Sequence, residues 1–169
     1  MEISRTRALR GPNLWSRNTA IECVVHCTPD EADFTRIVGF EDKLRARFPA
    51  IGSLQAQGID NTLSLAHVLE AAGLALQAQA GCQVTFSRTH ATVEPGTFQV
   101  VVEYTEEAVG KRAMALAEEL IQAALNDTAF DAKAAIHALQ ELDEDERVGP
   151  STGSLVNACL LYTSDAADE

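Results

Sequence analysis

The longest apolar stretch with helical spacing runs from Ser64 to Ala80, and it constrains the fold more than any other feature. Leucine and valine recur there mostly at helical separations with alanines between them, and Gly81 follows as a stop signal. A helix as apolar as this one has few sides that can face water. We therefore predict a buried helix at the centre of the fold.

Two polar residues, His67 and Glu70, interrupt this apolar stretch. They are three positions apart, so both project from the same face of a helix. A carboxylate is almost never fully buried without a partner. We expect Glu70 to be paired, to bind a ligand or to line a cleft, and the simplest structural alternative is a buried hydrogen bond between His67 and Glu70.

The chain has 169 residues, 46% of them hydrophobic, which suits one compact domain with a substantial core. No apolar run approaches the ~18 residues of a membrane span, and the first residues lack the apolar core of a signal peptide, so we expect a cytoplasmic protein without membrane contact. The net charge of −12 argues against non-specific binding of nucleic acid.

The remaining patterns predict strands over residues 2–9, 19–27, 83–90 and 97–104, the last two forming a hairpin. They predict helices over 33–48, with a break or bend near Gly39, over 108–125 and over 131–145. Between the first two strands, residues 10–16 form a turn in which Gly, Pro and Asn precede the single tryptophan, whose ring is expected to plug one end of the core. Strands and helices do not alternate strictly, which favours an α+β fold: a small mixed or antiparallel sheet of about four strands packed against the central helix and two or three further helices.

Two cysteines and a histidine lie close together in the segment Cys23-Val-Val-His-Cys27. They could contribute to a metal site, but such sites usually need a second pair of ligands, and none follows. The alternative is that these thiols, like that of Cys82, are reduced and buried.

The end of the chain differs in character from the rest. Residues 149–158 are rich in glycine, serine and proline and suit the start of a linker after a domain that spans 1–148. Residues 159–169 resemble the direct translation of a transposon-end adapter used to build sequencing libraries. We expect this tail to be foreign to the protein and to project without packing.

Segments spread over most of the chain carry a resemblance to a known family; they are residues 10–16, 39–49, 65–70, 76–82, 86–89, 99–104 and 142–154. In their order and number they resemble the amino-terminal domain of cyanophycin synthetase, the ligase that polymerises aspartate and arginine into a storage polypeptide. The resemblance implies a cytoplasmic, homo-oligomeric parent enzyme that uses ATP and Mg²⁺. It also implies that an ATP-grasp domain and a Mur-ligase-like domain, both missing here, would follow, and that this fragment binds no cofactor of its own.

In that family the first domain is thought to hold the growing polymer, cyanophycin, which has a polyaspartate backbone with arginine on each side chain. A holder of such a polymer needs guanidinium groups for carboxylates and carboxylates for guanidinium groups. The candidate polymer-binding residues are Arg5, Arg7, Arg10, Arg17, Arg45, Arg47, Arg88 and Glu103. Each of them could equally be a plain surface charge, and only a clustered patch would favour binding.

A second reading is enzymatic. Some members of the family carry His-x-x-Glu-His on the central helix and a further Glu one turn later, which resembles the inverted zinc motif of a class of peptidases. Here His67 and Glu70 are present, but Ala71 stands in place of the second His and Ala75 in place of the further Glu. We therefore expect a vestigial motif without metal or hydrolytic activity. A third reading, a pure oligomerisation module, predicts a large exposed apolar patch.

Overall fold

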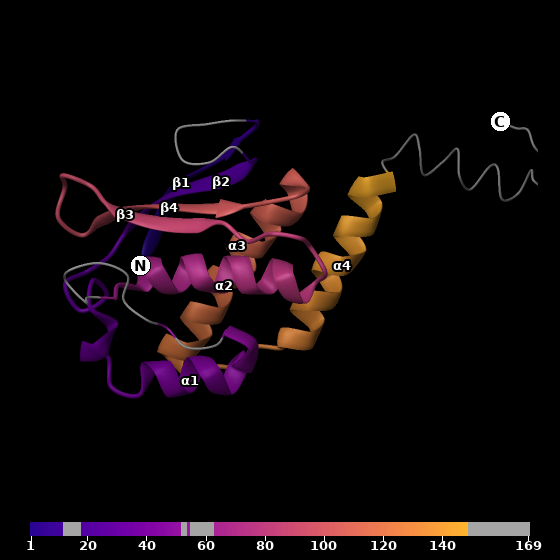
Figure 1. Ribbon diagram of the computed structural model, residues 1–169. Helices are drawn as coiled ribbons and strands as arrows, with labels where there is room; N and C mark the ends of the chain where they lie inside the picture. Colours follow the sequence, from indigo (N-terminus) through magenta and orange to yellow (C-terminus); the bar gives the residue numbers. More distant parts are fainter. Residues whose placement is uncertain (12–17, 52–53, 55–62, 149–169) are drawn as a thin grey trace, which may run out of the picture.

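The structure is a computed structural model, and it describes residues 1–11, 18–51, 54 and 63–148. In this part of the chain it shows the predicted α+β fold, with four α-helices and one open, fully antiparallel sheet of four strands. Figure 1 shows the helices gathered on one side of the sheet. None of the described helices combines the length and the apolar character that a membrane span requires.

The sheet has the strand order β1-β2-β4-β3. Strand β1 (Glu2–Leu9) forms a hairpin with β2 (Ala20–His26), and β3 (Ser87–Ala91) forms the predicted hairpin with β4 (Thr97–Glu103). The two hairpins join in the middle of the sheet, where β2 pairs with β4. Strands β1 and β3 are therefore the two edges.

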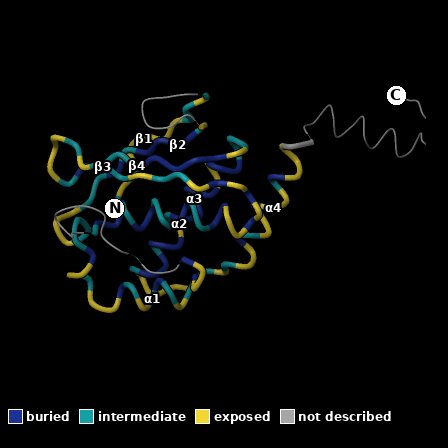
Figure 2. The backbone as a smooth tube through the Cα atoms, viewed as in Figure 1, coloured by how far each residue is buried: buried dark blue, intermediate teal, exposed yellow. Residues whose placement is uncertain are grey.

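Helices α2 (Leu65–Gln79) and α3 (Glu107–Asn126) pack against the same face of the sheet. The apolar side chains of β2 and β4 on that face, such as Ile21 and Val102, are fully buried. Figure 2 shows buried residues running along α2, α3 and the sheet, whereas exposed residues are common on α4. The prediction of a buried central helix is confirmed, because α2 contacts the sheet, α3 and α4.

Local sequence explains where α2 begins. Ser64 is the N-cap residue: its hydroxyl accepts a hydrogen bond from the backbone N–H of His67, and the His67 ring accepts one in return from the backbone N–H of Ser64. After the helix the chain turns at Gly81, whose φ of 97° is easily adopted only by a residue without a side chain. These two signals fix the length of the helix and so the position of His67 and Glu70.

The predicted boundaries were wrong in places. The predicted break near Gly39 is confirmed, because Gly39 adopts a left-handed φ of 73°, but the part before it is only a 3₁₀ turn (Phe34–Arg36) and α1 covers Phe40–Arg47. Strand β3 starts four residues later than predicted. Helix α4 (Ala132–Val148) continues past residue 145, the predicted end.

The late start of β3 has a physical cause in a buried carboxylate. The Oε1 atom of Glu103 accepts hydrogen bonds from the backbone N–H groups of Thr85 (2.8 Å) and Phe86 (3.0 Å). The N–H of Phe86 is therefore not available for β4, although its carbonyl oxygen accepts the N–H of Glu103 at 2.9 Å, and the regular ladder begins at Ser87. Such a contact cannot be read from a strand pattern.

Several predictions concern residues outside the described part of the chain. They are the turn over 12–16 with its tryptophan, Arg17, the linker over 149–158 and the adapter-like tail over 159–169.

Candidate functional site

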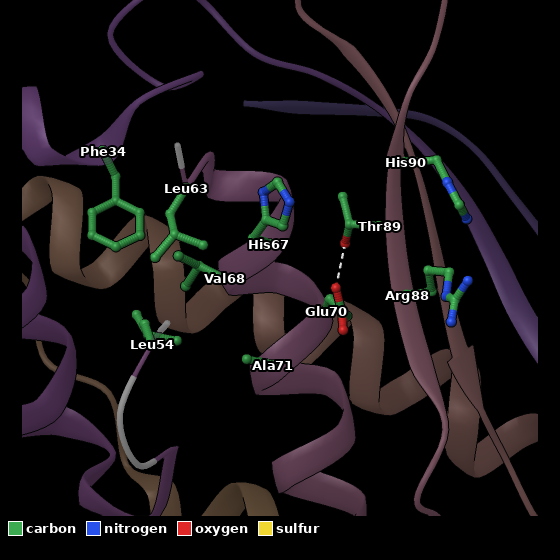
Figure 3. Close-up of a pocket in the computed structure, with 10 residues that line it drawn as sticks. All are labelled: Phe34, Leu54, Leu63, His67, Val68, Glu70, Ala71, Arg88, Thr89 and His90. Atoms are coloured by element: carbon green, nitrogen blue, oxygen red, sulfur yellow. Dashed lines mark hydrogen bonds between the residues drawn. The ribbon is translucent and has the colours of Figure 1, made fainter. Parts of the chain in front are cut away.

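A pocket of about 490 Å³ opens between α2, the 3₁₀ turn and the edge strand β3. Its walls combine apolar and polar side chains in similar numbers, and the residues of the vestigial motif, His67 and Glu70, are among the polar ones (Figure 3). The lining residues are Phe34, Leu54, Leu63, His67, Val68, Glu70, Ala71, Arg88, Thr89 and His90. The expectation that Glu70 lines a cleft is thus confirmed.

Glu70 bridges α2 and β3. Its Oε2 atom accepts a hydrogen bond from the Ser87 hydroxyl, and its Oε1 atom accepts one from the Thr89 hydroxyl, both at 2.6 Å. Ser87 and Thr89 are two apart on β3, so both point to the face of the sheet that α2 covers. The alternating strand pattern around Arg88 contained this signal, but the sequence alone did not identify the acceptor.

His67 does not pair with Glu70, which corrects the simplest sequence-based alternative. The Nδ1 atom of His67 accepts the N–H of Ser64 at 3.1 Å, and its ring lies edge-on to Phe98 with 6.0 Å between centroids. Burial lowers the pKa of His67, an effect that the nearby charge of Glu70 only partly opposes. A neutral ring whose Nδ1 is an acceptor carries its proton on Nε2.

The residues around His67 do not fit a catalytic zinc ion. Such a site needs about three protein ligands. Ala71 and Ala75 occupy the positions one and two turns further along α2 and offer no donor atoms. Among the residues that the structure describes, no group of three or more His, Cys, Asp or Glu side chains is arranged to hold a metal.

The cysteine cluster likewise has the character of core residues. Cys23, Cys27 and Cys82 are free thiols, and Cys23 and Cys82 are buried. Burial raises the pKa values of Cys23 and Cys27 to about 11, so both thiols stay protonated near neutral pH.

A second feature is the face of the sheet that points away from α2 and α3. In one row across the strands, Arg7 lies opposite Glu22, Glu22 opposite Val101, and Val101 opposite Arg88. Residues paired in this way project from the same face. Arg5 projects from this face too, because it is two positions from Arg7 on β1. Three of the predicted arginines therefore share one face of the sheet, which we call the arginine face.

Glu22 organises one side of the arginine face. Its Oε1 atom lies 2.6 Å from Nε of Arg7 and 3.3 Å from Nη2 of Arg5. The Glu22 side chain is only 2% exposed, whereas those of Arg5 and Arg7 are 55% and 54% exposed. One buried carboxylate thus positions two guanidinium groups that remain open to solvent. Sequence reasoning missed Glu22, although a lone carboxylate in the apolar strand β2 was a signal.

On the other edge strand, Arg88 lies over the ring of Phe86, with 5.9 Å from its guanidinium carbon to the ring centroid. Figure 3 shows Arg88 and His90 on the side of β3 opposite to Glu70 and Thr89. Arg88 therefore lies both on the arginine face and at the rim of the pocket.

Among the described residues, the other candidate arginines do not lie on this face. Arg10 forms a forked ion pair with Glu107 at the start of α3 (2.7 and 3.0 Å). Arg45 pairs with Glu41 on α1, and Arg47 donates to the carbonyl group of residue 128 after α3.

Glu103 was predicted as a surface carboxylate for the polymer, and its position contradicts that expectation. It is 8% exposed, and its Oε1 atom binds the two backbone N–H groups before β3. Its carboxylate therefore serves the fold and is not presented to a ligand.

Comparison with known proteins identifies a related family. The model of the family described as "Cyanophycin synthase-like N-terminal domain" matches residues 24–126. The cyanophycin synthetases of Trichormus variabilis and Crocosphaera subtropica are each 31% identical to the chain over 172 residues. That of Synechocystis sp. is 28% identical over 172 residues. Each match covers 92% of the chain but only 19% or 20% of the relative, so the chain spans about a fifth of the length of these curated relatives.

Proposed function

The chain belongs to the family of cyanophycin synthase-like N-terminal domains, and on this premise we propose that it holds the growing cyanophycin polymer and has no catalytic activity itself. The observation that carries the proposal is the arginine face. It presents three guanidinium groups, those of Arg5, Arg7 and Arg88, on a protein whose net charge is −12.

The chemistry of the polymer supports this role. Each arginine that is attached to the polyaspartate backbone keeps a free carboxylate and a guanidinium group. Guanidinium groups bind carboxylates in forked pairs, and Arg5 and Arg7 each have five N–H donors, of which Glu22 engages few. Because these pairs form at a wet surface, each contributes only about 0–1 kcal/mol, so binding depends on several of them together.

We propose that the whole protein is an ATP-dependent ligase that uses Mg²⁺ and assembles as a homo-oligomer, with an ATP-grasp domain and a Mur-ligase-like domain as partners of this one. In that arrangement the domain keeps the polymer near the sites where aspartate and arginine are added. The two alanines beside His67 support the non-catalytic assignment, because a zinc-dependent hydrolase would need donor atoms at those positions.

A pure oligomerisation module finds less support. In the described part of the chain, the large hydrophobic side chains with high exposure are Val38 and Val93, which lie in different loops. Two separate side chains do not form the large apolar patch that such a module predicts.

Calorimetry with soluble cyanophycin segments tests the proposal. We expect weak binding at low ionic strength and weaker binding at high ionic strength, since salt screens contacts between exposed charges over about 10 Å at 0.1 M. Arg7→Gln should reduce the affinity. Arg112→Gln is the matched control, because Arg112 is similarly exposed (48%) and belongs to α3 and not to a strand of the arginine face. If the folded domain gives no heat at either ionic strength, it does not hold polymer, and a scaffolding role is favoured.

A further inference from the structure

Glu70 is the carboxylate whose environment the proposed polymer-holding role leaves unexplained. It is partly buried in the pocket, and its hydrogen bonds come from two neutral hydroxyl groups. Two other shielded carboxylates differ: Glu22 is matched by two arginines, whereas Glu103 is held by two backbone N–H groups and is closed off from ligands. No described Lys, Arg or His side chain lies within ion-pair distance of Glu70.

The hydroxyl groups of Ser87 and Thr89 hold the Glu70 carboxylate in a fixed orientation without neutralising it. Each carboxylate oxygen can accept more than one hydrogen bond, so both oxygens keep capacity for a further donor. A planar group with two parallel N–H donors, such as a guanidinium, matches this arrangement better than an ammonium group does.

The rest of the pocket favours a cation on an apolar stem. Leu54 and Ala71 are partly exposed apolar residues in the lining of the same pocket as Glu70. The methylene chain of an arginine packs well on such a surface while its charged head contacts a polar group. His67 is no obstacle, because burial lowers its pKa and an uncharged ring does not repel a cation.

We propose that this pocket binds one arginine side arm of the polymer, with the guanidinium group on Glu70 and the methylene stem against Leu54 and Ala71. The inference rests on the proposed polymer-holding function and assigns a ligand group to a specific place. Arg88 at the rim suits the free carboxylate of the same arm, so the two charged ends of the arm meet opposite charges. Because Arg88 also lies on the arginine face, the pocket and that face form one continuous binding surface.

The small alanine at position 71 contributes to this function. A residue with a long side chain there would project into the space that the arm occupies, because Ala71 lines the pocket. Position 71, where alanine stands in place of the second histidine of the zinc motif, is thus also the position that leaves room for the methylene stem.

An NMR titration with the dipeptide β-aspartyl-arginine tests this assignment. The ligand control is β-aspartyl-citrulline, which has a similar shape but no charge on the side arm. We expect the arginine dipeptide to shift the amide signals of Ala71 and Thr89 and to bind at least about tenfold more tightly than the citrulline dipeptide, as expected for a charge-assisted pair. Glu70→Gln should remove this preference, whereas Glu94→Gln in the β3–β4 turn should leave it unchanged.

A second variant guards against loss of structure, since Glu70 also joins α2 to β3. Ala71→Leu keeps that bridge and fills the pocket, so it should weaken dipeptide binding by a similar factor while the protein stays folded. The inference is wrong if both dipeptides bind equally, if neither shifts the pocket signals, or if both variants bind like the unmodified domain. If long polymer binds but the dipeptide does not, only the assignment of this pocket is wrong. If the dipeptide binds in the pocket but long polymer does not bind, the proposed polymer-holding function is wrong.

Discussion

Two helical glycines give a pair of substitutions of which one should destabilise the protein and the other should not. Gly110 on α3 lies against the sheet: a Cβ atom added there would be 2.6 Å from Cβ of Tyr104 and 3.0 Å from Cγ1 of Ile21. Gly73 on α2 faces the end of the Met114 side chain. The two sites differ in whether the neighbouring atom can move.

At Gly110 the neighbour is one bond from the backbone and cannot move alone. Overpacking a core by one methyl group costs about 1–3 kcal/mol, and this contact belongs at the upper end of that range. Alanine in a helix interior is more favourable than glycine by about 1 kcal/mol. Gly110→Ala should therefore destabilise the protein by about 1–2 kcal/mol.

At Gly73 the neighbour is a flexible thioether that can adopt another rotamer at low cost. The gain in helix propensity then dominates, and Gly73→Ala should be neutral or stabilising by up to about 1 kcal/mol. Urea unfolding followed by circular dichroism measures both free energies, and unchanged m-values would show that the unfolded states are comparable. A Gly110→Ala variant as stable as the parent protein would refute the close packing of α3 on Tyr104.

Two further predictions concern the metal motif and an ion pair. The unmodified chain should purify without stoichiometric zinc. Ala71→His with Ala75→Glu should instead bind about one zinc per chain, because both positions follow His67 by about one and two turns of α2. Elemental analysis after dialysis measures the zinc content, and a folded double variant without zinc would contradict the proposed motif alignment. The hydrogen bond from Arg10, with that from Lys111, lowers the pKa of Glu107 to about 2. The stabilisation from this pair is therefore present above the ordinary carboxylate pKa and is lost as the pH falls towards 2. Arg10→Gln should move the Glu107 titration midpoint upward in carboxylate NMR spectra, and an unchanged midpoint would show that the pair does not form in solution.

The sequence was sufficient to predict the element types and the fold class, because periodicity reflects which side of an element is buried. The central helix is the clearest case, because a long apolar run with helical spacing between Ser64 and Gly81 predicts a buried helix. Boundaries that depend on distant partners could not be predicted. The start of β3 depends on Glu103, which is remote in sequence and is brought there by the sheet.

The candidate site was only partly predictable, because it too depends on contacts between residues from different elements. His67 and Glu70 stood out as polar residues in an apolar helix, and the structure does place them in a pocket. Arg5, Arg7 and Arg88 could be named as charges, but their common face follows from the pairing of β2 with β4, which no local pattern reveals. Glu22 escaped notice because its role depends on two arginines from another strand.

The pairing of β2 with β4 also has a consequence for how the chain is made. His26 contacts Thr97, 71 residues later, so β2 leaves the ribosome long before its second partner exists. During that time β2 can form its hairpin with β1, but its other edge remains unpaired, and its apolar face, with residues such as Ile21 and Val25, is not yet covered by helices. An unpaired edge beside an apolar face can pair with strands of other chains. Slower synthesis should therefore increase aggregation of the nascent protein, and chaperones that shield extended segments should reduce it.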